Sequence, residues 1–155
     1  MKLTDYLKIE QVIPNLDGST KNEGLKSIAE SLARSPNSLE IGQSTIYDAL
    51  LEREDLGSTG IGDGIAIPHA KLPQISSMVA CFAKSDSGID FDAIDNQPVN
   101  LVFALLVPEN SAGLHLKALA RISRLLKSSD FRASLLSLQD AGEIYTAFQQ
   151  FDEGD

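Results

Sequence analysis

The segment "VNLVFALLV", residues 99–107, is apolar at every position except Asn100. A strand with one face in water alternates polar and apolar residues, whereas a strand covered on both faces is apolar throughout. The segment is also only about half as long as the roughly 20 residues that a membrane-spanning helix needs. It is therefore predicted to be a central strand of a sheet that is covered on both faces.

The segments around this strand predict the remaining architecture. Residues 65–67 ("IAI") and 76–85 ("SSMVACFAKS") are rich in branched and aromatic residues and are bounded by turn-forming residues, which indicates two more strands. Apolar residues at helical spacing come before and after this strand-rich centre. The predicted helices cover residues 20–35, 43–54, 113–129, a segment after Asp130, and 140–151. The prediction is an α/β fold, a single domain whose mixed β-sheet is flanked by α-helices.

The chain shows no internal repeat, no linker and no low-complexity segment, so residues 1–155 are predicted to form one domain. Thr20 with Glu23, and Asp140 with Glu143, have the spacing of a capping box at the start of the first and last helices. Residues 1–150 are expected to be ordered. The acidic C-terminal tail "DEGD", residues 152–155, is expected to fray.

The formal net charge of −9 argues against binding to nucleic acid or to an anionic membrane, because both would repel the chain overall. The N-terminal segment has acidic residues where a secretory signal would be apolar, so a cytoplasmic, soluble protein without membrane insertion is expected. The single cysteine, Cys81, lies in an apolar run and is predicted to be a small buried residue. A basic protein partner is compatible with this charge.

The stretch "GSTGIGDGIAIPHA", residues 57–70, ends close to His69, one of only two histidines. It lacks the spacing of a dinucleotide-binding fingerprint and the lysine of a P-loop. Its alternate glycines fit either a plain turn or a concavity of backbone N–H groups that binds an anion. Pro68 predicts that the strand ends or lies at an edge of the sheet. His69 is then either a partly buried histidine with a hydrogen-bond partner or a functional one.

Two further side chains have both a structural and a functional interpretation. His115 lies on the apolar stripe of a helix, near its N-terminus, where a core histidine or an anion-binding one can occur. Arg53 extends the inward stripe of another helix, where it can complement the helix C-terminus or bind phosphate. No G-x-S-x-G or H-E-x-x-H motif is present, so the set favours phosphoryl chemistry over serine hydrolysis or zinc chemistry.

Several of these segments together resemble a known family. "RE" at 53–54, the stretch at 57–70 and "HLKALARISRLL" at 115–126 resemble the mannitol/fructose-type enzyme IIA (EIIA) proteins of the bacterial phosphoenolpyruvate-dependent phosphotransferase system. The segment "FDAIDNQPVNLVFALLVP", residues 91–108, is similar in particular to the nitrogen-regulatory branch. The resemblance covers nearly the whole chain and implies the mannitol/fructose-type EIIA fold.

The resemblance also implies a mechanism. His69 accepts a phosphoryl group, on its Nε2 atom, from the phosphohistidine of an HPr-like phosphocarrier protein (NPr or HPr). His115 positions His69 and the phosphate, and Arg53 stabilises the phosphate. The phosphate site is expected to be lined by Ser58, Thr59, Gly60 and Gly62. No cofactor and no metal is expected.

For the nitrogen-regulatory branch, the resemblance implies regulatory protein targets, such as potassium-uptake or sensor-kinase proteins, that respond to the phosphorylation state. Two alternatives are open at this point. One is a sugar-specific transport component of the fructose or mannitol type, acting with a membrane partner. The other is a regulatory binding module that works independently of phosphorylation.

Overall fold

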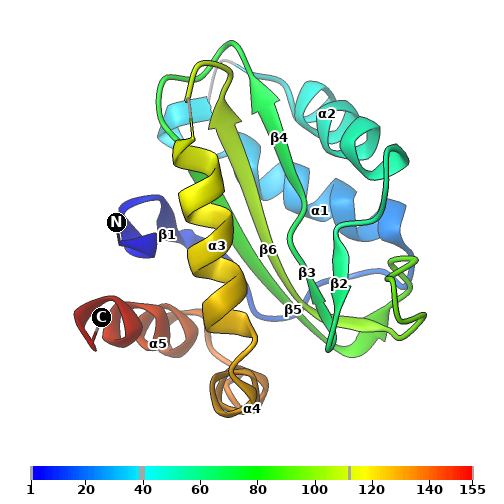
Figure 1. The fold of residues 1–155 in the computed structure, drawn as a ribbon, viewed down its shortest axis with the longest axis vertical. Helices are drawn as coiled ribbons and strands as arrows, with labels where there is room; N and C mark the ends of the chain where they lie inside the picture. The colour runs from blue at the N-terminus through cyan, green and yellow to red at the C-terminus, as the bar shows by residue number, and fades with distance from the viewer. Residues whose placement is uncertain (1, 39–40, 112, 155) are drawn as a thin grey trace.

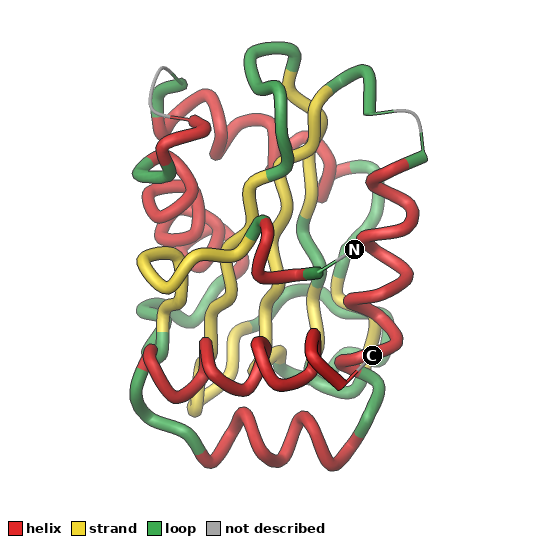
Figure 2. Tube along the Cα trace, turned by 90° about the vertical axis from the view of Figure 1, so that its left-hand side faces the viewer, coloured by secondary structure: helices red, strands yellow, loops and turns green. Residues whose placement is uncertain are grey.

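The computed structural model describes residues 2–38, 41–111 and 113–154, and in this part of the chain one mixed sheet lies between two layers of helices (Figures 1 and 2). The strands are β1 (Leu7–Ile13), β2 (Gly60–Gly62), β3 (Ile65–Ala66), β4 (His69–Leu72), β5 (Val79–Ile89) and β6 (Val99–Pro108). The helices are α1 (Lys21–Ala33), α2 (Gln43–Asp55), α3 (Leu114–Leu126), α4 (Ser129–Ser137) and α5 (Ala141–Gly154), with short 3₁₀ turns η1 (Leu3–Asp5) and η2 (Pro36–Ser38).

The strand order is β1-β5-β6-β3-β2, and β4 pairs with β6 beyond the end of β3. β5 runs antiparallel to β6, whereas β3 and β4 run parallel to it. β1 runs parallel to β5, and β2 runs antiparallel to β3. The predicted mixed sheet between helices is therefore confirmed.

β6 is a central strand with both faces covered, as its apolar sequence predicts. Val102, Ala104 and Leu106 pack into the cluster that also holds the apolar faces of α1 and α2. Phe103 and Leu105, from the other side of the same strand, pack against α3, α4 and α5. These five residues are at most 1% exposed. The alternation of side chains along one strand thus divides the core into two layers.

The two predicted capping patterns lie at helix starts in the structure, whereas α3 ends at Leu126 rather than residue 129 and α4 begins at Ser129 rather than after Asp130. Thr20 and Glu23 form a complete capping box at the start of α1. At the start of α5, the Asp140 carboxylate accepts a hydrogen bond from the backbone N–H of Glu143 at 3.2 Å. Such caps satisfy backbone donors that have no partner within the helix.

The strands predicted from sequence correspond to β3, β5 and β6, so β1, β2 and β4 were not predicted. The longest of these three is β1. Its segment "LKIEQVI" has the burial pattern of an irregular edge strand, with one buried residue followed by three exposed ones and then two buried ones. The register against β5 shifts between Leu7 and Val12. The sequence alternates apolar and polar residues only from Leu7 to Glu10, a run of four residues that ends where the register shifts.

The expectation that the C-terminal tail frays is wrong for the residues up to Gly154, because α5 continues to that residue. Asp152 is 6% exposed. Its carboxylate accepts hydrogen bonds from the backbone N–H groups of Leu3 and Thr4 at 2.9 and 3.0 Å. The tail is held by these long-range contacts, which local composition does not reveal. Asp155 lies outside the described residues.

Two smaller observations concern the class of protein. Cys81 is fully buried on β5, as predicted, and burial raises the pKa of its thiol to about 12, which keeps it neutral. None of the helices in the described ranges has the length and apolar character that crossing a bilayer requires.

Candidate functional site

His69 is the first residue of β4, at the point where two short strands succeed each other beside β6. β3 ends at Ala66, and Pro68 lies in the connection between β3 and β4. The carbonyl of Pro68 still accepts a hydrogen bond from the N–H of Leu105 at 2.9 Å. Since β4 pairs only with β6, it lies at an edge of the sheet, as the proline predicts.

The His69 ring is half-buried and is held by the backbone. His69 lies opposite Leu105, which belongs to the core layer beneath α3, so the ring points to that face. Its Nδ1 atom is 2.9 Å from the carbonyl oxygen of Ile67. A carbonyl oxygen can only accept, so in the neutral ring Nδ1 carries the proton and Nε2 keeps its lone pair.

The surroundings of His69 lower its pKa below the ordinary 6.5. Burial is the largest cause, and the electrostatic effects of Arg53 and His115 act in the same direction. The Ile67 carbonyl and the Glu54 carboxylate oppose this shift but do not outweigh it. The ring is therefore neutral at neutral pH, which is the form that can act as a nucleophile.

Two adjoining hollows share His69 and Arg53 in their lining. One hollow is lined by Ala49, Glu52, Arg53, Leu56, His69, Ala70, Lys71 and His115. The other is lined by Arg53, Ser58, Thr59, Ile61, Ile67, His69, Leu119 and Ser123. The structure therefore brings together both histidines and the arginine that the sequence singles out, with Ser58 and Thr59 beside them.

Arg53 lies in the last turn of α2 and satisfies both interpretations of its position. One of its terminal nitrogens donates a hydrogen bond to the carbonyl of Gly57 at 2.9 Å, just beyond the helix end. A guanidinium has five N–H donors, so this bond is compatible with phosphate binding at the same time. The bond also orients the side chain toward the two hollows.

His115 is half-buried in the first turn of α3, which follows Gly113. Its Nδ1 atom is buried and has no hydrogen-bond partner within residues 2–38, 41–111 and 113–154. A histidine with a purely structural role usually has such a partner. This observation favours the functional interpretation over that of a satisfied core residue.

The glycine-rich turn is a scaffold whose polar groups bond to the protein itself. The N–H of Gly60 donates to the Ser58 hydroxyl at 3.0 Å, and that hydroxyl donates to the carbonyl of Phe91 at 2.9 Å. An added Cβ on Gly60 would meet the Cβ of Ala93 at 2.8 Å, and Gly62 has a φ of +96°. Gly60 and Gly62 lie in β2, outside the lining of both hollows. Their placement supports plain turn geometry rather than an anion cradle.

The linings also contain side chains that were not singled out from the sequence, among them Glu52, Leu56 and Lys71. Glu52 and Lys71 are charged residues at the mouth of the first hollow, and Leu56 is 83% exposed beside them. Leu56 comes directly after α2, and an exposed leucine there is a weak indication of a binding surface. Lys71 could have been found more easily, because it is two residues after His69 on the same strand and so lies on the same face.

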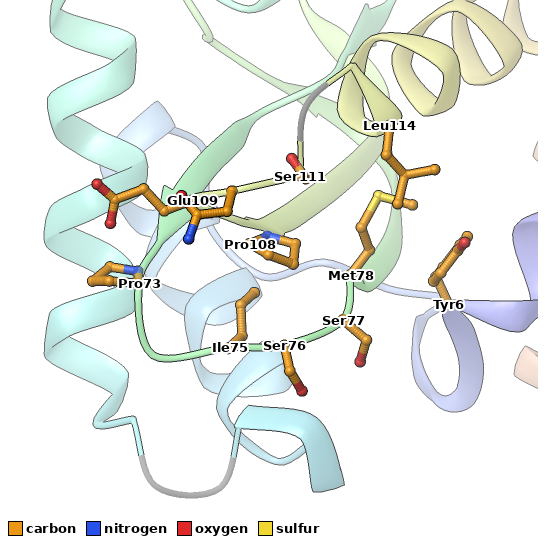
Figure 3. A pocket seen from close by; sticks show the side chains of 11 residues that line it. Tyr6, Pro73, Ile75, Ser76, Ser77, Met78, Pro108, Glu109, Ser111 and Leu114 are labelled. Carbon is orange, nitrogen blue, oxygen red and sulfur yellow. The ribbon is translucent and has the colours of Figure 1, made fainter.

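A separate hollow of about 440 Å³ lies around the loop between β4 and β5 and the end of β6 (Figure 3). Met78 and Leu114 point toward one another there, and Glu109 is the only acidic side chain in its lining. This lining contains no histidine and no arginine, so it lacks the residue types that the sequence singles out.

Comparison with known proteins shows a family relationship over most of the chain. Residues 5–151 match the family model described as "Phosphoenolpyruvate-dependent sugar phosphotransferase system, EIIA 2". A nitrogen regulatory protein of Bradyrhizobium diazoefficiens is 42% identical over 146 residues, which cover 94% of each chain. The fructose-specific EIIABC component of Bacillus subtilis is 32% identical over 154 residues, which cover 99% of this chain but 24% of that protein.

Among solved structures, the nitrogen regulatory protein IIA-Ntr of Neisseria meningitidis has a TM-score of 0.85 and 29% identity, with 93% of this chain and 97% of that chain covered. The family resemblance of the sequence is thereby confirmed. The chain belongs to the EIIA 2 family of the phosphoenolpyruvate-dependent phosphotransferase system, and within it to the nitrogen regulatory IIA proteins.

Proposed function

We propose that the protein is a phosphoryl carrier of the nitrogen phosphotransferase system, in which His69 accepts a phosphoryl group from the phosphohistidine of an HPr-like carrier (NPr or HPr). The observation that supports this most directly is the hydrogen bond from His69 Nδ1 to the Ile67 carbonyl. It leaves Nε2 as the nucleophilic atom, in a hollow that Arg53 and His115 also line.

In the proposed step, the lone pair of His69 Nε2 attacks the phosphorus atom in line with the carrier's P–N bond. The new Nε2–P bond forms as that bond breaks, and its electron pair returns to the carrier's imidazole. The proton on His69 Nδ1 stays in place, and the Ile67 carbonyl stabilises the positive charge that the ring gains. No proton has to leave the protein.

The protein stabilises the transferred group by position and charge. Arg53 supplies a planar set of N–H donors that suits phosphate oxygens. His115 lies in the first turn of α3, where the helix dipole favours a negative group. Ser58 and Thr59 line the second hollow together with His69. Such positioning and charge stabilisation are the main requirements of phosphoryl transfer.

The consequence of this chemistry is regulation. Phosphorylation adds negative charge beside Leu56, an exposed apolar residue at the mouth of the hollow. A protein that docks on this surface would therefore bind the two forms differently. We assign the targets to the class of potassium-uptake or sensor-kinase proteins, in the cytoplasm, on the similarity to nitrogen regulatory proteins.

A sugar-specific role is the second candidate, because the whole chain is also similar to part of a fructose-specific EIIABC component. In that case phospho-His69 would pass its group to a membrane sugar transporter. Reconstitution with fructose or mannitol transporter components distinguishes the two roles. Sugar phosphorylation that depends on His69 would replace the regulatory assignment.

The carrier chemistry is tested by incubation with phosphoenolpyruvate, enzyme I and an HPr-type carrier. The expected product is an acid-labile, base-stable adduct that His69→Ala abolishes. His115→Ala should retain the site but label at least tenfold more slowly, because positioning of the phosphate is lost. Labelling that persists in His69→Ala and disappears in His115→Ala would reverse the two roles.

A regulatory module that works independently of phosphorylation is tested separately. Wild type, His69→Ala and His69→Asp are compared for capture of a potassium-uptake or sensor-kinase protein, with and without prior phosphorylation. Different capture by the phosphorylated and unphosphorylated wild type supports the proposed regulation. Equal capture by all forms would favour the module that ignores phosphorylation.

A further inference from the structure

Glu54 is a buried carboxylate close enough to His69, the proposed phosphoryl acceptor, for its charge to affect the pKa of that ring. It follows Arg53 in the last turn of α2, and its side chain is 1% exposed. The two carboxylate oxygens accept the backbone N–H of Thr59 at 3.1 and 3.0 Å, and one of them also accepts the Thr59 hydroxyl. Three contacts therefore fix Thr59 to the end of α2.

Glu54 is connected to His69 through the backbone. The carbonyl of Thr59 accepts a hydrogen bond from the N–H of Ile67 at 3.0 Å. The carbonyl of that same Ile67 accepts the Nδ1 proton of His69 at 2.9 Å. The N–H and the carbonyl of Ile67 lie on either side of its Cα, so a displacement of Thr59 would shift Ile67 and, with it, the carbonyl that selects the His69 tautomer.

Lys21 supplies the compensating charge for the buried carboxylate. Its ammonium lies 3.4 Å from Glu54 and 3.4 Å from Asp92, and its side chain is 15% exposed. It also lies 5.8 Å from the centre of the Phe91 ring. A buried ion pair is often no more stabilising than apolar residues of the same volume, so a role in fixing geometry accounts for it better than stability alone.

We infer that Glu54, with Lys21 as its counter-ion, is a positioning residue that holds His69 in the Nδ1–H tautomer through Thr59 and Ile67. The inference rests on the proposed function for its consequence in phosphoryl transfer. Its structural content, the tautomer of His69, is independent of any carrier. Glu54 is not part of the lining of either hollow, so apart from its charge, which opposes the lowering of the His69 pKa, it acts through Thr59 and Ile67.

Glu54→Gln is the first test, because the amide has the same shape but lacks one acceptor and the charge. Thr59 then loses part of its contacts with the end of α2, and Ile67, whose N–H donates to the Thr59 carbonyl, is held less firmly. The ¹⁵N chemical shifts of the His69 ring, at a pH where it is neutral, should show a reduced share of the Nδ1–H form. Single-turnover transfer from a phosphorylated HPr-type carrier should slow by about tenfold or more.

Glu30→Gln is the matched control, since it removes the same charge from an exposed pair with Arg34. It should leave both the tautomer and the rate unchanged. Lys21→Met is the second variant, and it removes the counter-ion while keeping the Glu54 side chain. It should reduce the Nδ1–H share as well, so the test holds even where Glu54→Gln does not fold.

A folded Glu54→Gln or Lys21→Met protein with the wild-type tautomer would overturn the inference, whatever its rate. If no carrier labels the wild type, the proposed function fails, but the tautomer measurement still decides the role of Glu54. A reduced Nδ1–H share in both variants, with Glu30→Gln unchanged, supports it.

Discussion

The Nδ1 atom of His69 lies 2.9 Å from the carbonyl oxygen of Ile67, only two residues earlier in the chain. Pro68 lies between them and fixes its own φ, which restricts the geometry of this short loop. The sequence "IPH" thus contains both the nucleophile and the group that sets its tautomer. The chemistry of the site and its pH dependence follow from this contact and from the charges around it.

The first prediction concerns the titration of His69. Its midpoint should lie below 6.5, because burial and the charges of Arg53 and His115 disfavour the protonated ring. NMR titration of the ring proton measures this, and spectra of His115→Ala assign the signal. A midpoint at or above 6.5 would contradict the buried, neutral ring.

The same shift predicts how stability changes with pH. The folded protein binds fewer protons at His69 than the unfolded chain does, so stability falls as the pH drops from 6.5 through the lowered pKa of the folded state. His69→Asn lacks this component and should lose less free energy of unfolding between pH 7.5 and 5.5. Urea unfolding of both proteins at the two pH values gives the difference, and parallel losses would argue against it.

The second prediction concerns Gly60. Gly60→Ala should destabilise the fold by about 1–3 kcal/mol, because the new methyl group would lie 2.8 Å from the Cβ of Ala93. Gly42→Ala is the control, because none of the residues that the structure describes lies within 4 Å of its added Cβ. Chemical denaturation measures both, and equal effects would show that the strand relaxes around Gly60.

The third prediction concerns Lys84, whose side chain is fully buried on β5. Its ammonium donates hydrogen bonds to the carbonyls of Leu136 and Leu138, at the end of α4, and pairs with Asp86 at 3.3 Å. Lys84→Met leaves these carbonyls without their donor and should cost about 1–3 kcal/mol.

The control for Lys84 is Lys26→Met on the exposed side of α1, which should change stability by less than about 0.5 kcal/mol. Hydrogen exchange of α4 amides adds a local measurement. Faster exchange in α4 is expected for Lys84→Met alone, and unchanged exchange would rule out its role at the helix end.

The fourth prediction concerns Asp152, which accepts hydrogen bonds from Leu3 and Thr4 and pairs with Arg121 at 3.1 Å. Asp152→Ala should destabilise by about 2–3 kcal/mol, because several bonds to a charged group are lost. Glu153→Ala, at the exposed neighbouring position, should have little effect. Equal effects of the two variants in thermal unfolding would refute the role of Asp152.

The contribution of Asp152 to the stability of the fold also depends on pH, and the direction of this dependence follows from its pKa. Burial raises its pKa, but the hydrogen bonds from Thr4, Leu3 and Arg121 outweigh this and lower the pKa below 3.8. The folded state therefore binds the proton more weakly, and the stabilisation is present above pH 3.8 and is lost as the pH falls through the lowered pKa. The difference in stability between wild type and Asp152→Ala should shrink over that range.

The fold was predictable where the order of polar and apolar residues within a segment is enough to indicate its secondary structure and burial. The uniform apolarity of residues 99–107 indicated a strand with two covered faces, and Thr20 with Glu23 marked the start of α1. β1 was not found in this way, because its apolar–polar alternation covers only residues 7–10 and ends where the register against β5 shifts. The held C-terminus could not be found either, since the partner of Asp152 lies 149 residues away at Leu3.

The sequence by itself determined the helices, the central strands and the residue types capable of phosphoryl chemistry, because these depend on local periodicity and on side-chain chemistry. Only the tertiary structure decided which of them meet. Pairing of β4 with β6 at the sheet edge places His69 between the last turn of α2, which carries Arg53, and the first turn of α3, which carries His115. The same packing buries Glu54, whose carboxylate accepts the backbone N–H of Thr59. This hydrogen bond depends on the path of the chain between the two residues and not on either residue alone.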